Sequence, residues 1–127
     1  MSVKFYENFE KALQKLKEFS NDFDGSEMHM AAMIQAFEFT FEQCWKTIQK
    51  KAGQEGVNVA SPKKALEWAM SAGWLLRDDE AAWLKMLNDR NLSSHTYRES
   101  VAKEVTNHIR ISYLGHFEKI LTRMTNG

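Results

Sequence analysis

The chain has 127 residues, of which 43% are hydrophobic and 27% charged, and its 17 basic residues balance its 17 acidic residues. This composition indicates one globular domain over residues 1–127 and excludes an intrinsically disordered chain, which contains fewer apolar residues. The even charge also excludes a general electrostatic attraction of the whole protein to nucleic acid.

Cysteine content and hydropathy bear on the location of the protein. Cys44 is the single cysteine and cannot form an internal disulfide, so nothing argues for secretion. No apolar run approaches the roughly 20 residues that span a bilayer. Residues 1–19 carry acidic residues throughout and lack the small-residue cleavage site of a signal peptide. We therefore expect a cytoplasmic protein that does not enter a membrane.

Two helices are expected in the first half of the chain. Apolar residues spaced three and four apart predict a helix over residues 3–19. The second helix should cover residues 27–51, with Ser26 as its N-cap. Two glycines, Gly53 and Gly56, follow it as stop signals. The apolar stripe of the first helix consists of Phe5, Phe9, Leu13 and Leu16.

Three further helices are expected in the second half. Ser61 as N-cap followed by Pro62 starts a short third helix. Asp78 or Asp79 caps a fourth, which carries Trp83, Leu84 and Leu87. Thr96 and Glu99 fit a capping box at the start of the last helix, which continues to about Met124. The pattern predicts an all-α fold, an up-and-down four-helix bundle with an additional short helix.

The segment from Arg90 to Tyr97, RNLSSHTY, interrupts the apolar pattern and concentrates chemically active side chains. Arginine binds phosphate through a planar pair of hydrogen bonds. Histidine titrates near neutral pH and serves as a general acid or base. Arg90 and Asn91 holding a phosphate, with His95 moving a proton, would suit RNA cleavage without a metal. An R-x4-H spacing also occurs by chance, and a plain capping and packing segment is the competing interpretation.

Helix geometry limits how this segment can act. On a continuous helix Arg90 and Tyr97 share a face, as do Asn91 and His95. Arg90 and His95 would differ by about 140° and could not act on one ligand. We therefore expect either a helix break between them, as the Thr96 cap suggests, or a second copy bringing its own Arg90 across a two-fold axis.

The string RNLSSHTY resembles the R-x4-H-x-Y motif of the HEPN family (higher eukaryotes and prokaryotes nucleotide-binding). It is most similar to the branch described as nucleotidyltransferase substrate-binding proteins, which are encoded beside minimal nucleotidyltransferases. The resemblance extends from about Phe5 to Leu121 and includes other short matches in the expected order. These are Phe37-Glu38, Phe41-Glu42, Trp45-Lys46, Ser61-Pro62-Lys63, Ala69 with Gly73, and Trp83-Leu84.

The resemblance implies a homodimer whose two motifs meet in one composite cleft. It implies the toxin of a toxin–antitoxin pair, a metal-independent ribonuclease acting on RNA and neutralised by a partner nucleotidyltransferase. Arg90 and His95 would be catalytic, Asn91 would support them, and Tyr97 would receive AMP from the partner. The alternative is a non-catalytic subunit that binds substrate or nucleotide within a nucleotidyltransferase complex.

Other residues carry weaker signals. Glu38 and Glu42 lie four apart on one helix face and could contact a partner, hold a cation or be solvated. His108 and His116 either flank the cleft or pack. Cys44 fits a small core residue. The chain has no zinc-ligand spacing and no glycine-rich phosphate loop, so we expect neither a metal nor a cofactor.

Overall fold

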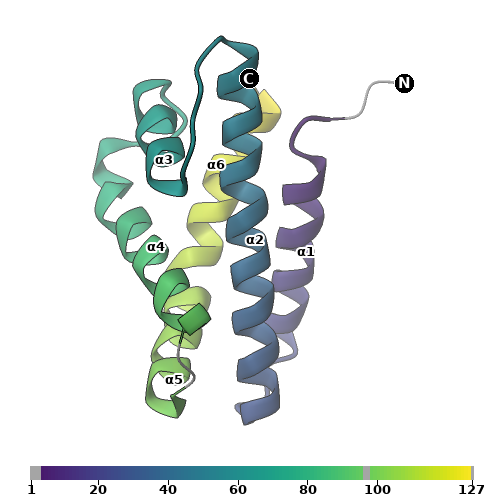
Figure 1. Cartoon of the computed structure of the whole chain (residues 1–127). Helices are drawn as coiled ribbons and strands as arrows, with labels where there is room; N and C mark the ends of the chain where they lie inside the picture. The colour runs from purple at the N-terminus through teal and green to yellow at the C-terminus, as the bar shows by residue number, and fades with distance from the viewer. Residues whose placement is uncertain (1–3, 96–97, 127) are drawn as a thin grey trace.

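The computed structural model describes residues 4–95 and 98–126, and of residues 93–95 only the backbone. Within this part of the chain all regular structure is helical, which confirms the expected all-α class (Figure 1). A 3-10 turn, Arg77–Asp79, precedes α4, and a π-helical segment, Ile109–Tyr113, joins α5 to α6. The α-helices are α1 (Glu7–Asn21), α2 (Glu27–Gln54), α3 (Pro62–Ser71), α4 (Glu80–His95), α5 (Glu99–His108) and α6 (Leu114–Asn126).

The long helix α2 is the spine of the fold. It packs against α1, α3, α4 and α5, and α1 also packs against α6. Figure 1 shows α1 and α2 side by side, α4 descending toward α5, and α6 returning behind α2, with the short α3 at one end. The arrangement is that of up-and-down helices with one short addition. No helix in the described ranges is long and apolar enough to cross a membrane.

The predicted start signals of α2 and α3 are confirmed. Ser26 Oγ accepts a hydrogen bond from the backbone N–H of His29 at 3.2 Å, and Ser61 Oγ accepts one from Lys64 at 3.2 Å. Each serine thereby satisfies one of the N–H groups that the first turn of a helix leaves unpaired. Pro62 is the first residue of α3, as its fixed φ favours.

The predicted helix ends are less accurate. The first helix covers Glu7–Asn21, not residues 3–19, because Tyr6 is its N-cap and Phe5 turns away to stack on Trp74 at 6.0 Å between ring centroids. The second helix continues past residue 51 to Gln54. Gly53 lies inside it, and Gly56, with a φ of +82°, is the stop signal, since glycine adopts this conformation without a Cβ clash.

The most consequential correction concerns α4. The helix continues through Arg90 to His95, so the first of the two expected arrangements, a break between these residues, is wrong, and the second-copy arrangement stays a prediction. The N-cap of α5 is Arg98, with extended φ and ψ of −133° and 134°, two residues later than the predicted cap Thr96, which lies outside the described residues. Polar residues do not break a helix when they can face solvent, and Asn91 is exposed here.

Aromatic rings fill the space between α2, α4 and the last helical run. Phe37 stacks on Tyr113 with the ring centroids 5.5 Å apart, and Trp83 meets Phe117 edge-on at 5.8 Å. All four side chains are at most 2% exposed, whereas Leu84, beside Trp83, is 44% exposed. Burying such rings is the largest apolar contribution that single side chains make to a core. This packing sets the rotation of α4, and therefore the direction in which Arg90 points.

Candidate functional site

Arg90 lies on α4 and points toward α2. Its Nη2 donates to Oε2 of Glu42 at 3.1 Å, and its Nη1 donates to Oδ1 of Asn91 at 3.2 Å. The two side chains of the ion pair are 30% and 29% exposed, so the pair is partly shielded from water but open to a ligand. The structure thus brings together two predicted site residues, Arg90 and Asn91, with a residue of undecided role, Glu42.

Glu42 is the centre of this cluster. Its carboxylate also accepts hydrogen bonds from Nε1 of Trp45 at 3.0 Å and lies 3.2 Å from Nζ of Lys46. Burial alone would raise the pKa of the carboxyl, but the bonds from Trp45 and Lys46 and the charges of Lys46 and Arg90 outweigh it and lower the pKa. Two cations therefore share one carboxylate, an arrangement suited to an anionic ligand.

A second polar cluster is centred on Asp89, the residue that precedes Arg90 on α4. Asp89 is 7% exposed, and its Oδ2 accepts a hydrogen bond from the Tyr113 hydroxyl. The same oxygen lies 2.8 Å from Nδ1 of His108, which donates because a carboxylate can only accept. Burial raises the pKa of the Tyr113 hydroxyl, and the bond to Asp89 and the charges of Asp89 and Glu104 raise it further. Tyr113 is therefore a neutral donor.

The π-helical segment makes this second cluster possible. Val105, Ile109, Tyr113 and Phe117 are all buried and recur every four residues. On a regular α-helix each such step would drift about 40° around the axis, and the wider π turn absorbs that drift. Tyr113 is thereby kept on the core side, within reach of Asp89.

Motifs and spacing alone did not reveal the role of Asp89 and Tyr113, although both leave a signal in the sequence. Asp89 follows Trp83 and Met86 at spacings of three, so it continues the buried face of α4. A carboxylate on a buried face needs partners. The four-residue recurrence in the last helix predicts that Tyr113 faces inward and can be one of them.

Three of the remaining candidate residues are Cys44, His108 and His116. Cys44 is buried and burial raises its pKa, which confirms a core role. His108 binds Asp89, whereas His116 packs beside Trp83 with ring centroids 6.4 Å apart. Within the described ranges, no three His, Cys, Asp or Glu side chains are grouped to hold a metal ion.

The other half of the predicted motif is not placed. Tyr97 and the side chain of His95 lie outside the described residues, so their roles stay predictions. The backbone still constrains one of them. Because α4 is continuous, the positions of Arg90 and His95 are about 140° apart around its axis. The two positions therefore do not share a face of α4, and the described residues form a cluster of two cations around Glu42 in which no proton carrier is placed.

Comparisons with known proteins found a family model and a solved structure that match this chain. The family model described as "Nucleotidyltransferase substrate binding protein like" matches residues 4–126. The crystal structure of ttk003001694 from Thermus thermophilus is similar, with 40% sequence identity and a TM-score of 0.80. The match covers 91% of this chain and 98% of that chain. No curated protein matches.

We predict that Tyr113→Phe lowers the free energy of unfolding by about 2 kcal/mol, because a buried hydrogen bond to a charged group is worth about 1.5–3 kcal/mol. Urea denaturation measures the difference. Tyr6→Phe is the matched control. The Tyr6 ring packs edge-on against Phe5 near the start of α1, and the loss of its hydroxyl should cost under about 0.5 kcal/mol. Equal stabilities of the two variants would contradict the role of the Asp89 cluster.

Glu42→Gln should change how stability depends on pH. The pKa of Glu42 is lowered in the folded chain, so its contribution is complete above the ordinary value of 4.5 and is lost as the pH falls below it. The wild type should therefore exceed the variant in free energy of unfolding at pH 7, and the excess should shrink under acid conditions. A difference in the free energy of unfolding that stays constant as the pH falls would refute the assignment.

Proposed function

The chain belongs to the nucleotidyltransferase substrate binding protein like family, and from this membership we propose that it is a non-catalytic subunit serving a nucleotidyltransferase. It would act in the cytoplasm and bind the phosphate of a substrate or nucleotide. The observation that carries the proposal is the guanidinium of Arg90, held against Glu42 beside a second cation, Lys46.

The proposed binding step is an exchange of anions. Glu42 orients the guanidinium before a ligand arrives, which reduces the entropy that binding must overcome. A phosphate would then take bidentate hydrogen bonds from Arg90 and a charge contact from Lys46. The Glu42 carboxylate would turn aside and release the indole N–H of Trp45, with which it is hydrogen-bonded at 3.0 Å. Substrate would be held, while the reacting groups would belong to the transferase.

The indole N–H of Trp45 provides the test. In an NMR titration with inorganic pyrophosphate, its signal should shift, while those of Trp68, Trp74 and Trp83 serve as internal controls. Arg90→Gln should weaken binding about tenfold or more, since hydrogen bonds to charged groups are lost. Lys85→Gln, an exposed charge on the same helix, should bind like the wild type. An unshifted Trp45 signal, or an Arg90→Gln variant that binds normally, would refute the proposal.

A second candidate function is the toxin ribonuclease, which would act as a homodimer, and one observation supports such a dimer. Leu84 and Leu92 on α4 are 44% and 48% exposed, which gives a second copy of the chain an apolar contact on the helix that carries Arg90. In such a homodimer the Arg90 of one chain would meet His95 of the other at RNA. The partner nucleotidyltransferase would silence the site by transferring AMP to Tyr97.

Expression of the wild-type chain without any partner gene separates the two candidates. A ribonuclease should arrest growth and cleave RNA, and both effects should vanish in His95→Ala and in Arg90→Ala. His95→Ala is the decisive variant, because the binding subunit needs Arg90 and not His95. A harmless wild type that cleaves no RNA would eliminate the toxin and leave the binding subunit.

A further inference from the structure

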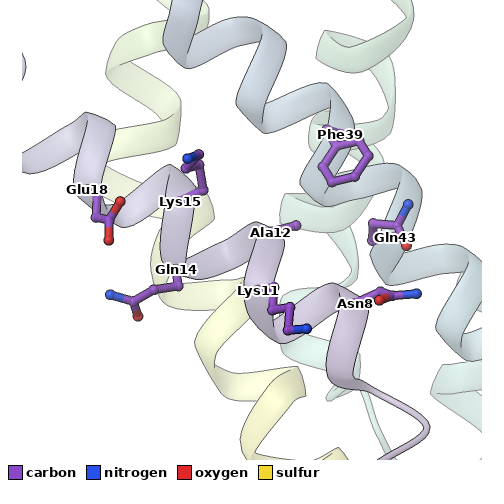
Figure 2. A pocket seen from close by; sticks show the side chains of 8 residues that line it. All are labelled: Asn8, Lys11, Ala12, Gln14, Lys15, Glu18, Phe39 and Gln43. Atoms are coloured by element: carbon purple, nitrogen blue, oxygen red, sulfur yellow. The ribbon is translucent and has the colours of Figure 1, made fainter.

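A hollow of about 670 Å³ lies between α1 and α2, away from Arg90. Figure 2 shows Lys11 and Lys15 on either side of Ala12 on α1, with Phe39 and Gln43 facing them from α2. The two helices are close at this level, since Oγ1 of Thr40 donates to the carbonyl oxygen of Ala12 at 3.2 Å. The methyl group of Ala12 forms a small floor, and longer side chains form the walls.

The lysines give the hollow a positive character. Lys15 is exposed and forms no ion pair with any residue that the structure describes. Lys11 lies 3.4 Å from Glu7, but its side chain is 73% exposed, and so open a pair contributes little. The carboxylate of Glu18 lines only the end beyond Lys15. An anion is therefore favoured between Lys11 and Lys15.

The ring of Phe39 is the second unusual feature. It is 57% exposed in the middle of α2, where a phenylalanine gains nothing from the core. A stable protein interface buries about 800 Å² on each side, which needs several apolar residues. The other large apolar residue of α2 that is well exposed, Met28, lies eleven residues away, about 16 Å along the helix. A single exposed ring beside lysines suits a stacking ligand better than a protein surface.

We propose that this hollow is a nucleotide-binding site separate from the Arg90 cluster. The base stacks on Phe39, and the phosphate lies between Lys11 and Lys15. The side-chain amides of Asn8 and Gln43, on opposite walls, can donate to and accept from the base edge. The volume of 670 Å³ lies within the range of about 300–1,000 Å³ that small ligands occupy. Aromatic stacking accepts any base, so the site selects nucleotides as a class.

The site is tested by NMR with AMP, observing the Ala12 methyl group and the Gln43 side-chain amide. Both signals should shift. Phe39→Ala should weaken binding about tenfold, because stacking on one base is lost. Lys15→Gln should weaken it several-fold and reduce its dependence on salt. Lys64→Gln, a 69% exposed lysine on α3, is the matched control and should bind normally. Because Phe39 and Lys15 are exposed, all variants should unfold at the wild-type temperature.

Further arms of the experiment identify the source of the nucleotide and the outcomes that overturn the site. A short single-stranded oligoadenylate that outcompetes AMP at Ala12 and Gln43 would make the ligand a nucleic-acid strand. Free AMP binding more tightly would make it a mononucleotide. Failure of both to shift these signals would overturn the proposal, as would Phe39→Ala binding like the wild type, which would indicate charge attraction alone. Pyrophosphate at Trp45 tests the Arg90 cluster independently, so either site can fail alone.

Discussion

The buried carboxylate of Asp89 is the constraint on which the rest of the site depends. An unpaired carboxylate inside a bundle would cost several kcal/mol, so the fold must bring donors to it. His108 and Tyr113 are those donors, and both come from the last helical run. The π-helical segment keeps Tyr113 facing inward. The neighbouring residue, Arg90, is consequently held in one orientation, and Glu42 receives its guanidinium.

In this arrangement, neighbouring faces of α2 contribute to different candidate sites. Glu42 and Phe39 are three residues apart, which places them about 60° apart around the helix axis. Glu42 faces α4 and belongs to the Arg90 cluster, whereas Phe39 faces the hollow beside α1. The inner face of the same helix carries Phe37 and Phe41, which are fully buried. The helix α2 thus contributes side chains to the core, to the Arg90 cluster and to the hollow beside α1.

Local chemistry explains which parts of the structure could be predicted. Ser26 and the Ser61-Pro62 pair act on their own first turns, and the apolar stripes depend on helix period alone, so the sequence is sufficient for both. The link from Glu42 to Arg90 joins residues 48 positions apart and depends on how α2 and α4 pack. Capping rules do not contain that information. The same rules placed the cap of the last helix at Thr96, two residues before the observed N-cap Arg98.

The continuity of α4 decides how the R-x4-H motif can function. Helix geometry holds the positions of Arg90 and His95 about 140° apart around the axis of α4. The proposed acid–base chemistry at one phosphate would therefore draw Arg90 and His95 from two copies of the chain, whereas the proposed phosphate binding would use only Arg90 and its neighbours on α2. The Arg90 cluster is complete within one chain, because Glu42, Trp45 and Lys46 all come from α2. A binding role therefore needs fewer conditions than a catalytic one, and dimerisation is the condition that separates them.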